Sequence, residues 1–229
     1  MSDSVGAQTT ASELYSERAQ TYLRFIRSVG YPQGLRAIFM GSSVLSSDLR
    51  VLDAGCGTGV TTLALRSALA ARGMPARRID AFDLTPAMLG RFRSTLAASG
   101  IEDVELARAD VLALETLPRE WSNYDLVVTA SMLEYVPRES FPVALRGLRG
   151  RLREGGKLLL FITRNNALMR PLIGRWWEAN LYTRAEIRVA LKEAGFIDTS
   201  FGRFPFPYRH LDLWGHAVSA RAAPSRSAI

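Results

Sequence analysis

A glycine-rich turn placed directly after an apolar strand constrains this chain more than any other feature. Residues 51–59 read Val-Leu-Asp-Ala-Gly-Cys-Gly-Thr-Gly, with three alternating glycines after Asp53. Glycine tolerates positive φ and has no Cβ, so the backbone of such a turn can approach a bound molecule closely. A second short apolar segment, residues 79–83, ends in Asp83. Strand, glycine-rich turn, helix, strand and terminal acid is the order that holds a nucleoside at the edge of a parallel sheet.

The spacing of the glycines argues against a phosphate ligand. A dinucleotide-binding turn has the pattern G-x-G-x-x-G, whereas here the third glycine comes one residue early, at Gly59, and Val60 occupies the expected place. The Gly-Lys-Ser/Thr of a Walker turn is also missing after Gly59, and that sequence is needed to hold nucleotide phosphates. The remaining interpretation is a cofactor that has an adenosine and no phosphate.

Downstream segments extend this pattern into a family resemblance. Ala-Asp-Val at 109–111 follows a third predicted strand, a fourth covers 124–130 and leads into the segment 131–137, and a fifth covers 157–162. With the glycine-rich turn, this order resembles the class I (Rossmann-like) S-adenosylmethionine-dependent methyltransferases over roughly residues 12–222. The resemblance implies S-adenosyl-L-methionine as cofactor and S-adenosyl-L-homocysteine as product.

The resemblance also implies which residues hold the cofactor. In that family the turn passes under the methionine part, the acid after the second strand binds both ribose hydroxyls, and an acid after the third strand lies near the adenine amino group. The matching and flanking positions here are Asp53, Gly55, Cys56, Gly57, Asp83, Leu84, Met88, Asp110, Val111 and Ala130. Tyr15 could close over the methionine end of the cofactor, with plain packing as the alternative. Taken alone, Asp53 could merely cap the following helix and Asp83 could be a turn acid.

Alternating strands and helices predict a doubly wound α/β fold, with a mostly parallel sheet and helices on both faces. The resemblance implies seven strands with an antiparallel edge strand, and 196–204 and 216–222 are expected to close the sheet as a hairpin. Apolar residues at three- and four-residue steps from Leu14 to Val29 predict a helix. It belongs to an N-terminal helical cover, residues 13–45, over the mouth of the site.

The chain is expected to form one domain. Its 229 residues, 48% of them hydrophobic, suit a single α/β domain over 13–222, with disordered ends at 1–12 and 223–229. An apolar run of about 18 residues, as a membrane span needs, is missing, and the first residues lack the layout of a secretory signal. The single cysteine, Cys56, excludes an internal disulfide. A cytoplasmic protein without a metal is the simplest prediction.

The charge leaves the partner open. The formal net charge is +7 and the pI about 10.1, which raises nucleic acid as a partner. The arginines are scattered, however, and lysine occurs only at Lys157 and Lys192. We therefore keep an RNA methyltransferase, and a non-catalytic cofactor-binding module, as alternatives to an enzyme acting on a small molecule.

The sequence lacks the motifs of the methyltransferases that act on several classes of acceptor. Residues 129–132 read Thr-Ala-Ser-Met instead of the Asn/Asp-Pro-Pro-Tyr/Phe that accompanies methylation of aromatic or amide nitrogens, and Cys56 lies in the turn, not where a pyrimidine nucleophile would. The paired-glutamate loop of protein arginine methyltransferases and the clustered acids of a metal-dependent catechol enzyme are also missing. A small-molecule or lipid-like acceptor, methylated on oxygen or nitrogen, remains.

The connection over residues 163–182 is long enough to predict a lid. A plain packing helix and an amphipathic membrane-contacting helix remain as alternatives. Its arginines and tryptophan pair suit an acceptor with an anionic group and an apolar body. The candidate acceptor-binding residues are Tyr22, Arg170, Arg175, Trp176 and Tyr182.

Candidate catalytic residues follow the fourth strand or lie late in the chain. Glu134 could act as a base or orient the acceptor, with an exposed acid at a helix start as the alternative. Tyr135 stands where many small-molecule methyltransferases of this kind have a histidine. His210 could face the mouth, although a surface role is the simpler interpretation, and His216 is expected to be structural. A carboxylate acceptor, already ionised near neutral pH, would need no base.

Overall fold

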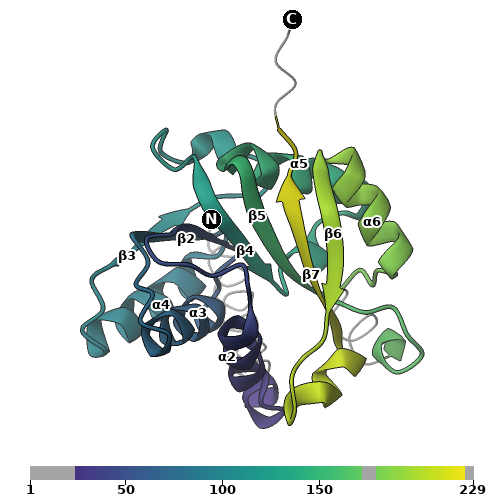
Figure 1. Ribbon diagram of the computed structural model, residues 1–229, viewed down its shortest axis with the longest axis horizontal. Helices are drawn as coiled ribbons and strands as arrows, with labels where there is room; N and C mark the ends of the chain where they lie inside the picture. The colour runs from purple at the N-terminus through teal and green to yellow at the C-terminus, as the bar shows by residue number, and fades with distance from the viewer. Residues whose placement is uncertain (1–23, 172–178, 225–229) are drawn as a thin grey trace, which may run out of the picture.

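The computed structural model of this chain describes residues 24–171 and 179–224, and a seven-stranded sheet runs through it (Figure 1). The strands are β1 (Arg50–Ala54), β2 (Arg78–Asp83), β3 (Val104–Arg108), β4 (Tyr124–Ala130), β5 (Leu152–Thr163), β6 (Phe196–Gly202) and β7 (Gly215–Ala222). Their order is β3-β2-β1-β4-β5-β7-β6. Strand β7 runs antiparallel to both of its neighbours, β5 and the outermost strand β6. The predicted doubly wound sheet is confirmed, and its order reverses between β1 and β4, where such sheets bind ligands.

Helices cover both faces of the sheet (Figure 1). They are α2 (Tyr31–Gly41), α3 (Val60–Ala71), α4 (Pro86–Ala98), α5 (Phe141–Arg151) and α6 (Arg184–Glu193). Alternate residues of β5 point to opposite faces: Leu158 and Leu160 pack with α5 and α6, whereas Leu159 and Phe161 pack with α2 and α3. This two-residue period is the one expected for a strand buried on both sides.

Local sequence signals explain several helix starts. Thr183 opens α6 with a capping box, in which its backbone N–H donates to Glu186 Oε2 at 2.7 Å and its hydroxyl accepts from the Glu186 N–H at 3.3 Å. Helix α4 begins at Pro86, whose fixed φ suits the first helical position. Both helices therefore begin at a local signal in the sequence.

The carboxyl ends of the parallel strands meet at one edge of the sheet, and segments distant in sequence cover that edge. Residues 24–28 are helical, and Phe25 packs against Trp214, with the ring centroids 5.0 Å apart. Helix α2 approaches the short 3-10 helix η5 (Tyr208–Leu213) so closely that a Cβ on Gly34 would lie 2.3 Å from Leu211. The described part of the N-terminal segment thus lies where a cover was expected.

The described parts of the predicted lid are anchored to the sheet edge. Arg164 and Tyr182 form a parallel bridge, and the side chain of Asn166 donates to the Leu213 carbonyl at 2.7 Å. Residues 172–178, the centre of that segment, lie outside the described residues. Within the residues that the structure describes, no helix is long and apolar enough to cross a membrane.

Candidate active site

The three glycines of the turn after β1 are needed for different structural reasons. All have positive φ: +73° at Gly55, +53° at Gly57 and +86° at Gly59. A Cβ on Gly55 would lie 2.3 Å from Cγ of Met132, and one on Gly59 would lie 2.1 Å from Cε2 of Phe92. A Cβ on Gly57 would meet no heavy atom of the described residues within 4 Å. Gly55 and Gly59 therefore serve packing, whereas Gly57 borders an open space that a ligand can fill.

Asp83 is held at the end of β2 by backbone donors. Its Oδ2 accepts from the Gly57 N–H and its Oδ1 from the Thr85 N–H, both at 2.8 Å. A carboxylate offers about four lone-pair positions, so two remain for a ligand. Asp83 is only half-buried. It is thus a fixed, accessible acceptor pair beside the open space at Gly57, which suits a vicinal diol.

Asp53 lies beneath the turn and is buried, with 1% of its surface exposed. Its Oδ2 accepts from the hydroxyl of Thr62 at 2.5 Å, and its Oδ1 has no partner among the described residues. Burial raises the pKa of Asp53 to about 7, the hydrogen bond from Thr62 opposes that rise, and the charge of Asp83 adds to it. A buried carboxyl with a free oxygen favours a positively charged group above it.

The other predicted cofactor residues lie at or after the ends of β2, β3 and β4. The Ala109 N–H donates to the Asp83 carbonyl at 3.2 Å, which places Asp110 beside the end of β2, and Asp110 Oδ1 accepts from the Leu112 N–H at 2.9 Å. Leu84 is 55% exposed. The remaining positions are half-buried or buried: Met88, Val111 and Ala130.

The thiol of Cys56 is not suited to nucleophilic chemistry. It is buried within the turn. Burial raises its pKa strongly, and the charges of Asp53 and Asp83 raise it further. Because the thiolate is the reactive form, Cys56 contributes to the turn through its backbone and its packing.

A cavity of about 70 Å³ adjoins the carboxyl ends of β4 and β5. Most of its wall is apolar or aromatic: Phe25, Val29, Phe161, Met169, Phe204 and Trp214. Its polar wall residues include Ser131, Glu134, Thr163 and His216. Ser131 has a φ of +52°, an unusual conformation for a residue with a Cβ. Strain of this kind gathers at functional sites.

Glu134 is the buried carboxyl of this cavity. It lies in the short 3-10 helix η2 (Leu133–Tyr135) and is 1% exposed. The Thr163 hydroxyl donates to its Oε1 at 2.8 Å, and its Oε2 has no partner within residues 24–171 and 179–224. Burial raises its pKa to about 7, against the opposing hydrogen bond from Thr163. A carboxyl that changes charge near neutral pH is suited to proton transfer.

His216 also lines the cavity, although the sequence suggested only a structural role. It is the second residue of β7, directly opposite Ile162 of β5, and it is 5% exposed. Burial lowers its pKa to about 4, and the charges of Arg164 and Arg184 lower it further. Its ring is therefore neutral at neutral pH. One ring nitrogen bonds the backbone of Tyr182, and Nε2 has no partner in the described part of the chain.

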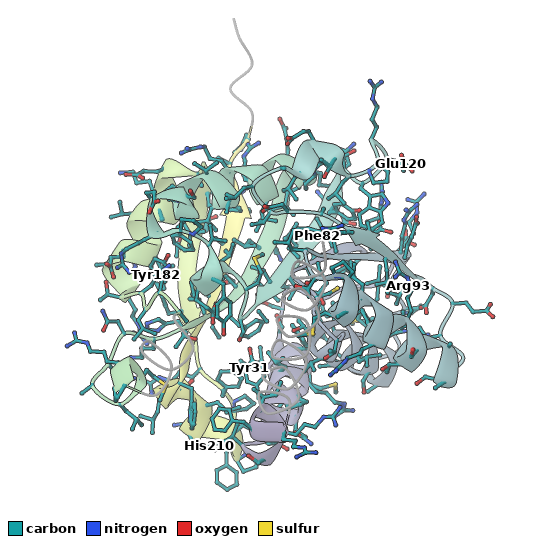
Figure 2. The ribbon with its side chains drawn as sticks, turned by 180° about the vertical axis from the view of Figure 1, so that it is seen from behind. Tyr31, Phe82, Arg93, Glu120, Tyr182 and His210 are labelled. Atoms are coloured by element: carbon teal, nitrogen blue, oxygen red, sulfur yellow. The ribbon has the colours of Figure 1, made fainter. Side chains whose placement is uncertain are left out.

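The other histidine lies elsewhere. His210, on η5, is exposed, and its Nε2 pairs with the Val29 carbonyl at 2.8 Å. It is not among the residues that line the cavity, and Figure 2 shows it at the end of the molecule formed by η5, away from Tyr182. This position favours the surface role over the catalytic one.

The remaining predicted residues divide into three groups. Tyr135 lines the cavity and is 49% exposed. Tyr182 is buried, with its ring stacked on Phe141 at 4.3 Å, and Arg170 is exposed and bonds Asn165 at 2.9 Å; neither lines the cavity. Four lie outside the described residues: Tyr15, Tyr22, Arg175 and Trp176. The described ranges contain no group of three or more His, Cys, Asp and Glu residues that could hold a metal ion.

The buried Glu134 carboxyl leads to a prediction about stability and pH. In the folded chain it keeps its proton up to about pH 7, whereas its usual pKa is 4.5. The stability of the folded chain therefore falls progressively as the pH rises from the usual pKa of the carboxyl to its raised pKa. Glutamine does not titrate. The free energy of unfolding of Glu134→Gln, relative to that of the wild type, is therefore expected to rise by on the order of 3 kcal/mol from about pH 5 to about pH 8.

Urea unfolding at the two pH values measures this gain. Glu139→Gln is the matched control, because Glu139 is exposed five residues away. A difference between Glu134→Gln and the wild type that does not change with pH would contradict the prediction.

The part of the chain that contains the glycine-rich turn matches a known protein family. Residues 51–156 match the family model described as "Methyltransferase domain". The carboxy-S-adenosyl-L-methionine synthase of Stutzerimonas stutzeri is 31% identical over 136 residues, which cover 58% of this chain and 54% of that protein. The malonyl-[acyl-carrier protein] O-methyltransferase of Halorhodospira halophila is 31% identical over 156 residues, covering 65% of this chain and 48% of that protein. The chain thus spans about half the length of these relatives.

Longer proteins and solved structures share the fold. A highly reducing polyketide synthase of Gibberella zeae is 26% identical over 71% of this chain, which spans 7% of that protein. The apo structure of the S-adenosylmethionine-dependent methyltransferase SibL has a TM-score of 0.65 at 23% identity, covering 82% of this chain and 55% of SibL. Magnesium protoporphyrin IX methyltransferase from Synechocystis, solved with its cofactor bound, has a TM-score of 0.62 at 19% identity, covering 85% of this chain and 81% of that one. These structural likenesses establish the fold.

Proposed function

Because the chain contains a methyltransferase domain of the class I S-adenosylmethionine-dependent family, we propose that it methylates a small-molecule or lipid-like acceptor held in the cavity beside β4 and β5. The observation that carries this proposal is the pairing of two sites on one sheet edge. The first is the open cradle formed by Gly57 and Asp83. The second is the largely apolar cavity that contains Glu134 and His216.

The first site fits the cofactor. Gly57 leaves its backbone open, Asp83 keeps two acceptor positions for the ribose hydroxyls, and the free oxygen of Asp53 lies below the turn. When bound, S-adenosylmethionine supplies an electrophilic methyl carbon on a positively charged sulfur. The two buried or half-buried carboxylates favour that positive charge. The protein then contributes mainly alignment, because holding two reactants in line removes much of the barrier to their reaction.

The second site fits a compact acceptor better than a polynucleotide. Its aromatic and aliphatic wall excludes water from the acceptor and suits an apolar body. Methylation on oxygen or nitrogen is consistent with the buried carboxyl of Glu134 in this wall. The relative named as a malonyl-[acyl-carrier protein] O-methyltransferase supports methylation on oxygen.

Incubation with methyl-labelled S-adenosylmethionine and a lysate of the source cells tests the proposal. We expect one or a few labelled small-molecule products, identified by mass spectrometry, and cofactor binding that calorimetry detects. Labelled RNA would support the RNA alternative, and cofactor binding without any labelled product would support a non-catalytic module. A wild-type protein that does not bind the cofactor would overturn the proposal itself.

A further inference from the structure

The cavity carries two hydrogen-bond acceptors that lack a donor. Among the described residues, Oε2 of Glu134 and Nε2 of His216 are buried and unpartnered. Each belongs to a side chain that lines the cavity. The other half of each group is already engaged, Oε1 of Glu134 by the Thr163 hydroxyl and the second imidazole nitrogen by the backbone of Tyr182. Leaving a buried acceptor unpaired costs about 1–3 kcal/mol, so both atoms favour a ligand that brings donors.

The protonation state of His216 strengthens this requirement. Its ring is neutral, and the nitrogen that bonds the Tyr182 carbonyl must carry the single proton. Nε2 therefore presents a lone pair. Glu134 in its ionised form presents only lone pairs as well. Two lone pairs at the same cavity favour a protic ligand.

Among the described residues, the cavity wall has no group that would hold an anion. None of the described residues that line it is an arginine or a lysine. Arg164 and Arg184 lower the pKa of His216 without lining the cavity themselves. A carboxylate acceptor would lose its hydration here and place its lone pairs against those of Glu134 and His216, which is unfavourable on both counts.

We propose that the cavity takes an uncharged acceptor with an apolar body and a hydroxyl, phenol or amine group that donates to Glu134 and His216, and that Glu134 removes the proton of that group. This inference rests on the proposed function and names its substrate class. It differs from the anionic acceptor expected from the arginines of residues 163–182, of which Arg175 lies outside the described residues. It also assigns a binding role to His216, for which the sequence predicted only a structural one.

The proposed step balances. The acceptor oxygen or nitrogen forms a bond to the methyl carbon while the carbon–sulfur bond breaks and leaves its electron pair on sulfur. The proton of the acceptor passes to Oε2 of Glu134, which begins as a carboxylate and ends as a carboxylic acid. The raised pKa of about 7 makes both forms accessible near neutral pH, which is the condition for an effective general base.

Ligand binding tests the acceptor class even before the natural acceptor is identified. Naphthol, naphthylamine and decanol are compared with naphthoate and decanoate by ligand-observed NMR, with S-adenosylhomocysteine present. Protic members are expected to bind at least about tenfold more tightly than the acids, because each engages an unpaired acceptor. Tighter binding of the acids, or no binding of any protic member, would overturn the proposal.

Variants separate the two acceptors. Glu134→Gln and His216→Phe are expected to reduce or abolish the preference for protic ligands, and Phe keeps an aromatic ring against Phe201, which packs edge-on at 5.6 Å. Glu139→Gln, an exposed change nearby, should keep it. Unaltered preference in both cavity variants would contradict the assignment.

Transfer measurements complete the test. With the acceptor that corresponds to the labelled lysate product, Glu134→Gln is expected to lower the transfer rate by about 100-fold or more while the affinity for the cofactor, measured by calorimetry, stays at the wild-type level. Transfer at the wild-type rate would refute Glu134 as the base and leave the methyltransferase function intact. Loss of cofactor binding in the wild-type protein would instead refute the proposed function.

Discussion

Replacement of Asp83 by asparagine is expected to weaken the binding of S-adenosylmethionine on the order of 100-fold. The carboxylate uses one oxygen for the Gly57 N–H and the other for the Thr85 N–H, and it keeps one position on each for a ligand. Asparagine turns one of those acceptors into a donor, so one backbone N–H would face another N–H. Both the orientation of the side chain and its bonds to the ribose are then lost. Isothermal titration calorimetry measures the change.

Asp103→Asn is the matched control. This carboxylate is exposed and pairs with Arg66 at 2.9 Å on the surface, where such pairs contribute little to stability. It should bind the cofactor as the wild type does. The thermal midpoints of both variants show whether they are folded. A folded Asp83→Asn protein with an affinity within about threefold of the wild type would show that this acid does not hold the cofactor.

The second large effect is expected at Gly59. A Cβ there would lie 2.1 Å from Phe92, and φ is +86°. Gly59→Ala therefore combines a collision with a buried aromatic ring and a backbone conformation that alanine rarely adopts. Together these are expected to lower the free energy of unfolding by on the order of 3 kcal/mol. Urea unfolding measures the loss. Replacing the ring by a smaller side chain, in the double variant Gly59→Ala with Phe92→Leu, should relieve the collision and recover part of the lost stability.

Gly57→Ala distinguishes packing from ligand access. Its φ is also positive, at +53°, but a Cβ there meets no neighbour within 4 Å among the described residues. We expect this variant to lose only about 1 kcal/mol of stability and to bind the cofactor much more weakly, because the new methyl group enters the open space. If Gly57→Ala and Gly59→Ala destabilise the fold equally, the collision with Phe92 is not the cause.

The proposed cofactor half of the site rests on residues that can be recognised in the sequence, because its determinants are local. The glycines lie within a single turn, and Asp83 and Asp110 follow strands whose ends meet at one edge in any parallel sheet. The pattern could not show that each glycine has a different neighbour. Met132 and Phe92 approach Gly55 and Gly59 from other elements, and that packing depends on the folded arrangement.

The acceptor half could be predicted only in part. Glu134 was identified as a candidate base, but its burial and its bond to Thr163, 29 residues away, were not visible in the sequence. The histidines show the difficulty most clearly. His216 was expected in a closing strand, and the pairing of that strand with β5 places it opposite Ile162, whereas His210 is engaged by Val29 from the N-terminal segment. Both outcomes depend on contacts between distant parts of the chain.

The reversed direction of β7 has a consequence for how this fold can be joined to other proteins. The strand starts with Gly215 and His216 at the edge that holds the cavity and runs to Ala222 at the opposite edge (Figure 1). Its first residues therefore contribute to the site, while its end leads the chain away from it. An affinity tag, a linker or a neighbouring domain attached after β7 would leave the mouth of the cavity open, so immobilisation through that end suits measurements of acceptor binding.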